Sequence, residues 1–134
     1  MTMRKLIFLV CMSTVISLAS CSTPDITISR ELGTEVEIFP DYKDIIIPCN
    51  IAPMNFNVLT EGEHHLIIEG AASSLQVEAE DGLVDIPIKE WRRLLRENMG
   101  QKLQFTVARN EDGEWLAYKP FTMEISPDEV DSHM

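Results

Sequence analysis

Two adjacent histidines, His64 and His65, are the first residues whose chemistry suggests a site. Imidazole nitrogens are common zinc ligands, but a zinc site needs three or four ligands that converge on one point. The residues that follow the pair, Leu66-Ile67-Ile68, favour a strand, in which adjacent side chains point to opposite faces. No cysteine or third histidine stands nearby in the sequence to complete a ligand set. We therefore predict a pair at the edge of a turn and no metal site.

Residues 110–114 resemble part of a calcium-binding loop. In an EF-hand alignment of Asn-Glu-Asp-Gly at residues 110–113, the first ligand position falls on Ala108. The last one, which should be a bidentate glutamate, falls on Lys119. Neither residue can supply the carboxylate that calcium requires. The same four residues are typical of a four-residue hairpin connection, and this is the interpretation that we favour.

Three cysteines stand at positions 11, 21 and 49. Cys49 lies in Pro48-Cys49-Asn50, where no neighbouring base or positive charge would activate the thiol as a nucleophile. We predict a small thiol that is packed or half-exposed. If Cys11 is removed with a leader and Cys21 is modified, Cys49 is left without a partner for an intrachain disulfide, even in an oxidising compartment.

The cysteine at position 21 closes the segment Leu18-Ala19-Ser20-Cys21. Small residues before a cysteine, with leucine three positions ahead of it, form the lipobox pattern of bacterial lipoproteins. In that pattern the thiol receives a diacylglyceryl group before the signal peptide is cleaved. Arg4 and Lys5 precede an apolar run at residues 6–16, which is too short to span a bilayer, since spanning takes roughly 20 residues. We predict a signal peptide at residues 1–20 and lipidation at Cys21.

The predicted lipid would hold the mature protein permanently in a membrane, because each buried methylene contributes about 0.8 kcal/mol and several acyl chains act together. The partner predicted with most support is thus the membrane itself, through the lipid on Cys21. Ser22, and not aspartate, follows this cysteine, and by the usual sorting rule this is typical of outer-membrane lipoproteins. The predicted location is the cell envelope, with the outer membrane favoured and the face undetermined.

Net charge excludes one class of partner. The whole chain carries −11 from 11 basic and 22 acidic residues. Removal of residues 1–20 takes away Arg4 and Lys5 and no acid, so the mature chain carries −13. Such a surface repels phosphate backbones, so we predict no nucleic-acid binding. The charge leaves open a protein or glycan partner in the envelope.

Catalytic patterns are missing from the sequence. We find no spacing of acids that selects a catalytic pair, no nucleophile elbow, no phosphate-binding glycine loop and no haem-attachment motif. We predict no catalytic residues, no cofactor and no enzymatic activity. The alternative is an envelope carbohydrate-active enzyme that uses paired carboxylates in a shared cleft.

The elements that must position these residues read mostly as short strands. Apolar residues alternate with polar ones around residues 54–58, 65–69, 75–80, 103–109 and 115–125, and the segment 45–58 reads as one strand interrupted by prolines. Asp81-Gly82 is a strong turn pair, and Pro120 breaks the last run.

One helix is predicted after Pro87. Its apolar face comprises Ile88, Trp91, Leu94, Leu95 and Met99, and Gly100 would end it. Trp91 should fill the space between the helix and the sheets and pack against Phe105 and Phe121. A pair of opposite charges four residues apart, Arg93 and Glu97, should lie on the solvated face.

Together these elements predict a mostly β fold: an antiparallel sandwich of immunoglobulin or fibronectin III character with one inserted helix. The predicted organisation has four parts. Residues 1–20 are the signal peptide, 21–43 the lipidated N-terminus and tether, 44–126 the β-sandwich domain, and 127–134 a tail that leads into a further domain.

Several segments resemble a known family. They are residues 40–44 (Pro-Asp-Tyr-Lys-Asp), residues 47–56 with Asn-Ile-Ala-Pro-Met-Asn-Phe, Ile86-Pro87, Lys89-Glu90-Trp91 with Leu94-Leu95, and residues 119–122 (Lys-Pro-Phe-Thr). In these segments the chain is similar to Gram-negative envelope lipoproteins in which an N-terminal sandwich precedes a TolB-like propeller of WD40-like repeats. Some members are labelled cytochrome c biogenesis proteins. The resemblance covers roughly residues 40–134 and implies an N-terminal accessory domain of a longer propeller protein. The lipobox, together with a sandwich pattern that lacks catalytic motifs, leads us to expect a lipid-anchored binding or structural module.

Overall fold

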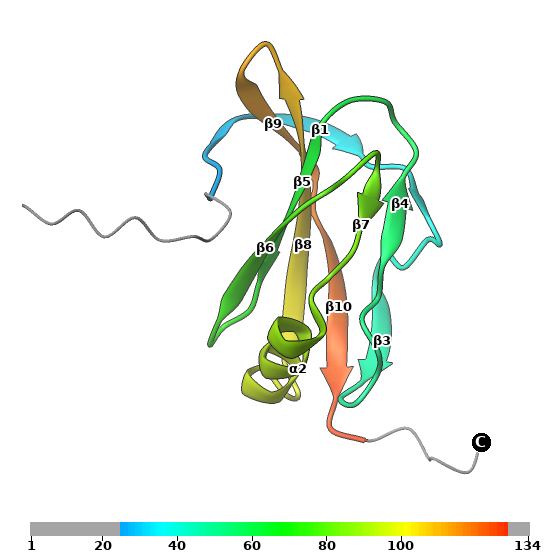
Figure 1. The fold of residues 1–134 in the computed structure, drawn as a ribbon. Coiled ribbons are helices and arrows are strands. Elements are labelled where there is room, and N and C mark those ends of the chain that lie inside the picture. Colours follow the sequence, from blue (N-terminus) through cyan, green and yellow to red (C-terminus); the bar gives the residue numbers. More distant parts are fainter. Residues whose placement is uncertain (1–24, 129–134) are drawn as a thin grey trace, which may run out of the picture.

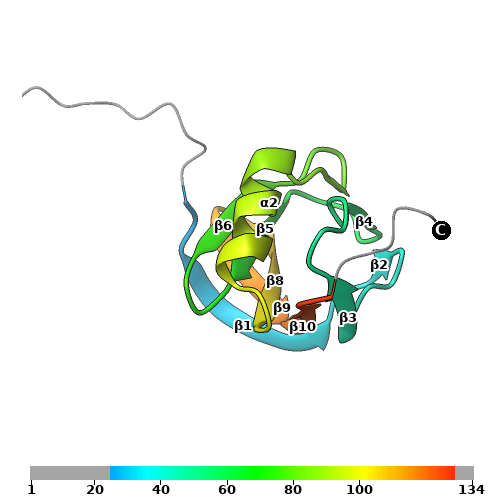
Figure 2. The same ribbon diagram turned by 90° about the horizontal axis from the view of Figure 1, so that it is seen from below.

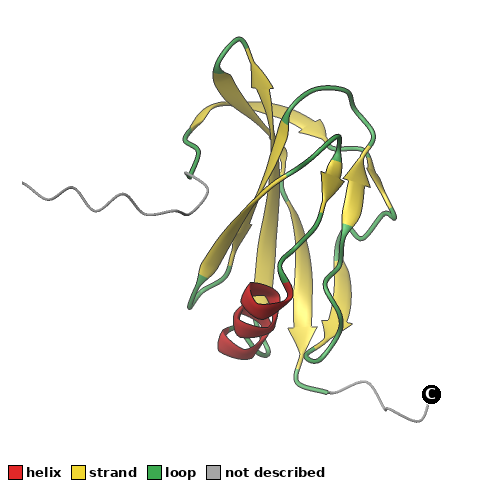
Figure 3. Ribbon diagram, in the orientation of Figure 1, coloured by secondary structure: helices red, strands yellow, loops and turns green. Residues whose placement is uncertain are grey.

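The computed structural model describes residues 25–128, which form a mostly β fold with one helix (Figure 1; Figure 3). The elements in chain order are β1 (Ile28–Glu35), β2 (Ile38–Phe39), β3 (Ile45–Pro48), β4 (Phe56–Val58), β5 (His64–Glu69), β6 (Ser74–Glu78), β7 (Leu83–Val84), α2 (Ile88–Glu97), β8 (Lys102–Glu111), β9 (Glu114–Lys119) and β10 (Phe121–Ser126). The predicted signal peptide, Cys21 and most of the predicted tail lie outside the described residues.

The larger sheet is built around β8, its longest strand. β5 pairs antiparallel with one edge of β8, and β6 pairs antiparallel with β5. On the other edge, β9 and β10 pair with opposite ends of β8. Pro120 separates β9 from β10, as the sequence predicted, because proline lacks the N–H that a continuous ladder needs. Two further strands add in parallel, β1 to β9 and β3 to β10.

The smaller sheet has the order β2-β4-β7 and faces the larger one. Its inward side chains are Ile38, Phe56, Val58 and Val84, all of which belong to the main core cluster. The Phe56 ring meets the edge of Phe121 from β10 at a centroid distance of 6.2 Å, so aromatic contacts join the two sheets. Two open sheets with a shared apolar core fit the predicted β-sandwich.

The helix α2 lies at one end of the sheets, near β5 and β6 (Figure 2). Trp91, Leu94 and Leu95 are buried in the core, as their helical spacing predicted. The Trp91 side chain is 0% exposed, and its indole N–H donates to the carbonyl of Ile51 over 3.0 Å. The predicted core position of Trp91 is therefore confirmed, and Phe105 and Phe121 belong to the same core cluster.

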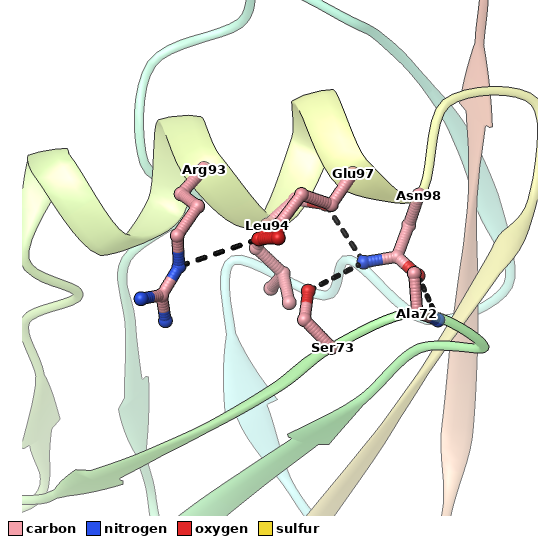
Figure 4. Close-up of polar contacts among 6 residues, drawn as sticks. All are labelled: Ala72, Ser73, Arg93, Leu94, Glu97 and Asn98. Carbon is pink, nitrogen blue, oxygen red and sulfur yellow. Dashed lines mark hydrogen bonds and ion pairs between the residues drawn. The ribbon is translucent and has the colours of Figure 1, made fainter.

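The predicted apolar face of the helix is too long at both ends. Ile88 is 48% exposed and Met99, just beyond the helix, is 47% exposed. The sequence spacing gives the face on which a residue lies, but the neighbouring sheets cover only the middle of that face. The predicted ion pair is present, with 3.5 Å between Arg93 Nε and Glu97 Oε1 (Figure 4).

Asn98 joins the end of α2 to the loop between β5 and β6 (Figure 4). This side chain is 0% exposed and makes three hydrogen bonds. Its Oδ1 accepts from the backbone N–H of Ala72 at 2.9 Å, and its Nδ2 donates to Ser73 Oγ at 3.1 Å and to the Leu94 carbonyl at 2.9 Å. Gly70 lies so close that a Cβ there would overlap the Asn98 amide.

The predicted tether at residues 21–43 requires a correction, because residues 28–39 are part of the folded domain. β1 pairs with β9 in the larger sheet and β2 pairs with β4 in the smaller one. Val36 and Ile38 are 1% and 5% exposed and belong to the core. Only residues 22–27 separate Cys21 from the first strand.

Two smaller predictions also change. Residues 45–58 form two strands in different sheets, β3 and β4, where the sequence suggested one interrupted strand. The predicted four-residue hairpin is a two-residue turn of Asp112 and Gly113, since Asn110 and Glu111 still belong to β8. Both turn residues have positive φ, 53° and 86°, which matches the tight turns that connect twisted strands.

Candidate functional site

The two adjacent histidines face opposite sides of β5, as predicted. His64 lies on the side of Tyr118, with 6.4 Å between the stacked rings, and its Nδ1 bonds to the Gly62 carbonyl at 3.0 Å. Its Nε2 is buried and has no hydrogen-bond partner among the described residues. Burial therefore lowers the pKa of His64, because the imidazolium would lose its hydration, and the positive charge of Arg109 adds to this effect.

His65 lies on the opposite face of the sheet, and Gln76 fixes its orientation. Gln76 Oε1 accepts the backbone N–H of Ile26 at 3.1 Å and lies 2.9 Å from His65 Nε2. Because the backbone N–H can only donate, the shared Gln76 atom is the oxygen, and His65 Nε2 must carry the proton. Gln76 thus ties the segment that enters the domain to β5 and β6.

A cleft opens over this face of the larger sheet, beside His65. It has a volume of about 540 Å³. Three separate parts of the chain contribute to it: the entering segment, the adjacent strands β5 and β6 with the turn before them, and the β8–β9 hairpin. The lining residues are Asp25, Ile26, Thr27, Glu63, His65, Glu78, Asn110, Gly113 and Trp115.

Trp115 is the aromatic wall of the cleft. It is half-buried and contacts the His65 ring at a centroid distance of 5.7 Å. In the β8–β9 hairpin it pairs with Asn110, so the two side chains lie on the same face. A half-exposed tryptophan in a concave site offers a flat apolar surface that a ligand can cover.

The polar groups of the cleft are dominated by carboxylates. Asp25, Glu63 and Glu78 are exposed at its walls, and no lysine or arginine occurs among the described residues that line it. Glu63 Oε2 accepts from Asn110 Nδ2 at 3.0 Å, and Asn110 Oδ1 accepts the N–H of Gly113. The amide of Asn110 is therefore engaged by Gly113 within the hairpin and by Glu63 across the sheet, while the carboxylates keep free acceptor positions.

The residues that resembled a calcium loop hold the hairpin instead. Asn110 bonds across the turn to Gly113 at 3.0 Å and across the sheet to Glu63. Among residues 25–128 there is no group of three or more His, Cys, Asp or Glu side chains placed to hold a metal ion. The acids of the cleft therefore lie around its wall and do not converge on one point.

Cys49 follows β3, away from this cleft. It is half-buried, as predicted, and its thiol donates to the Pro127 carbonyl at 3.5 Å. Cys49 forms no disulfide among the described residues. The other predicted modification site, Cys21, lies outside them.

The sequence did not predict the cleft. Its lining residues come from four stretches of the sequence, namely 25–27, 63 with 65, 78, and 110 with 113 and 115, and only the pairing of distant strands brings them together. The nearest signal in the sequence was the pair His64-His65. It lies on a strand that lines the cleft, but we considered it only as a possible pair of metal ligands.

No family model, curated protein or solved structure matches the chain. No helix among the described residues has the length and apolar character needed to cross a membrane.

Proposed function

We propose that the chain is a lipid-anchored binding or structural module of the bacterial cell envelope, without catalysis of its own. The lipobox at residues 18–21 supports the anchor, and the cleft around Trp115 supports a binding role. The predicted outer-membrane location is part of this proposal, and it rests on Ser22 after the lipidated cysteine.

The observation that carries the proposal is the short distance between the proposed anchor and the cleft. Asp25 lines the cleft and is four residues from Cys21. A fully extended chain spans at most about 3.6 Å per residue, so the two alpha carbons lie within about 14 Å of each other. A lipid on Cys21 would therefore hold the cleft next to the membrane surface.

Anchoring is tested by blocking lipidation. Globomycin should cause the uncleaved precursor to accumulate, and Cys21→Ala should release the protein from the membrane fraction. Cys49→Ala is the matched control, because it removes a different cysteine and should leave anchoring unchanged. Normal cleavage and membrane retention under the first two conditions would refute the anchor.

Sorting is tested separately. Ser22→Asp should move the lipidated protein from the outer to the inner membrane in a density-gradient separation. If the wild-type chain is already in the inner membrane, the proposed location is wrong, although the anchor is not.

We also propose that the sandwich has immunoglobulin-like topology. The strand order β6-β5-β8-β10 with β4 beside β7 in the facing sheet matches the order of strands in that fold. The parallel pairing of β3 with β10, an early strand with the last one, supports the same assignment. A crystal structure in which β3 instead continued into the sheet of β4 would contradict it.

From the resemblance in its sequence, we further propose that the module precedes a TolB-like propeller. The support is the Asn-Ile-Ala-Pro-Met-Asn-Phe segment at residues 50–56. Sequencing the DNA beyond the codon for Met134 tests this: an open frame with WD40-like repeats is expected, and an immediate stop codon would refute it.

A carbohydrate-active enzyme is the second candidate, because Glu63 and Glu78 share one cleft. Both side chains are exposed, whereas a catalytic acid is usually shielded from water, and this favours binding over hydrolysis. The test is hydrolysis of envelope glycans by the wild type and by Glu63→Gln and Glu78→Gln. Turnover that either substitution abolishes would establish the enzyme and overturn the non-catalytic proposal.

A further inference from the structure

We infer that the cleft around Trp115 binds an organic cation that carries two or more ammonium groups. This inference rests on the proposed binding function and names the ligand chemistry of that same site. It arises from the kinds of groups that the cleft presents, their spacing, and the charge of the chain around it.

The cleft offers acceptors and negative charge. The carboxylates of Asp25, Glu63 and Glu78 can only accept hydrogen bonds when ionised, and no lysine or arginine among the described lining residues balances them. Two of the other polar side chains are already engaged, because His65 donates to Gln76 and Asn110 bonds to Glu63 and Gly113, and the third, Thr27, carries no charge. A ligand that supplies both positive charge and N–H donors is therefore complementary to the cleft.

The spacing of the acids distinguishes an organic cation from a metal ion. A divalent cation needs ligands that meet at one point, and the described residues contain no such group. Asp25 lies in the entering segment, Glu63 in the turn before β5 and Glu78 at the end of β6, around a cleft of about 540 Å³. A ligand with several separated ammonium groups can reach such acids one at a time.

Trp115 adds a second attraction for positively charged groups. The face of an indole ring carries negative potential and attracts ammonium groups that lie over it. The half-buried ring is held against His65, so it stays in place when a ligand arrives. The mature charge of −13 would also raise the local concentration of cations around the domain.

Titration with two probes tests the inference. The full chain, purified in a neutral detergent at low ionic strength, is titrated with spermidine and with trilysine, and binding is followed by calorimetry and by the indole N–H resonances. The Trp115 resonance should shift, whereas the Trp91 resonance should not, because that indole bonds to Ile51 in the core. The tighter of the two probes identifies whether a free polyamine or a basic peptide is the better source of the ammonium groups.

Matched variants locate the binding. Glu78→Gln should weaken affinity by about twofold to fivefold, since an exposed ion pair contributes little in water. Glu63→Gln with Glu78→Gln should weaken it further. Glu124→Gln is the control for Glu78→Gln, because it removes one negative charge on β10, outside the cleft. It should leave affinity nearly unchanged. Added salt should weaken binding of either probe.

Three results would overturn the inference: no shift of the Trp115 resonance with either probe, equal losses for Glu78→Gln and Glu124→Gln, or tighter binding of the neutral sugar chitotriose than of both cations. Cys21→Ala, kept in detergent, should bind the probes as the wild type does. Membrane retention of Cys21→Ala in cells, with intact probe binding by the purified variant, would thus refute the proposed lipid anchor and leave the cation site standing.

Discussion

Replacing Trp91 with alanine should be the most damaging single truncation in the core. The indole is 0% exposed, and its N–H satisfies the carbonyl of Ile51. A buried tryptophan removes about 150–250 Å² from water, which at ~25 cal/mol per Å² corresponds to about 4–6 kcal/mol. Measured truncations of buried aromatic residues cost about 3–5 kcal/mol.

Loss of the hydrogen bond to Ile51 adds about 1 kcal/mol to the cost of this truncation. We therefore expect Trp91→Ala to lower the free energy of unfolding by about 4–6 kcal/mol, a large share of the ~5–15 kcal/mol of a typical domain. For a domain of this size the loss corresponds to a fall in Tm of about 15 °C or more.

Thermal unfolding monitored by circular dichroism measures this fall. Trp91→Phe keeps a six-membered ring but loses the N–H donor and the volume of the five-membered ring, so it should cost about 2 kcal/mol. Trp115→Ala is the control on the surface side: its ring is half-buried, and it should cost no more than Trp91→Phe. A Tm for Trp91→Ala within a few degrees of the wild type would refute the packing of α2 against the sheets.

Three further predictions concern Asn98, Gly70 and His64. Asn98→Ala removes three hydrogen bonds and should destabilise the domain by about 2–4 kcal/mol in urea unfolding. Gly70→Ala should cost about 1–3 kcal/mol, and less in the Asn98→Ala background because the overlap disappears; equal costs would contradict the contact. Burial lowers the pKa of His64 in the folded chain below its unfolded value of 6.5. As the pH falls below 6.5, the imidazole therefore takes up a proton in the unfolded chain before it does so in the folded chain. The free energy of unfolding should decrease over this pH range. In melting experiments from pH 8 to 5, His64→Phe should remove this part of the acid loss, and parallel pH profiles would exclude His64 as its source.

Local pattern predicted the elements whose signals lie within a few residues. The helical spacing of Trp91, Leu94 and Leu95 identified the buried face of α2, and Pro120 identified the break between β9 and β10. The turn at Asp81-Gly82 also formed as predicted, with positive φ at both residues. Each of these features depends on backbone geometry or on periodicity along one segment.

Features that depend on distant pairing could not be predicted in this way. β1 has six exposed residues among its eight, and its sequence reads as a polar tether, but its ladder forms with β9, some eighty residues later. The cleft has the same origin, because Asp25, Glu78 and Trp115 meet only when β1, β6 and β9 take their places in one sheet. The sequence showed that acids were numerous, but gave no reason to group these three.

The parallel pairing of β3 with β10 has a mechanical consequence. Ile45 lies beside Met123 and Pro48 beside Ser126, so the early strand and the last strand run in the same direction. If the chain is held at its N-terminal side by a membrane and pulled at its C-terminal side, tension acts on opposite ends of these two neighbouring strands. The backbone hydrogen bonds between the two strands are then loaded in shear all at once and cannot open one after another. Such a geometry resists stretching, and it would suit a domain placed between a fixed lipid and a moving load.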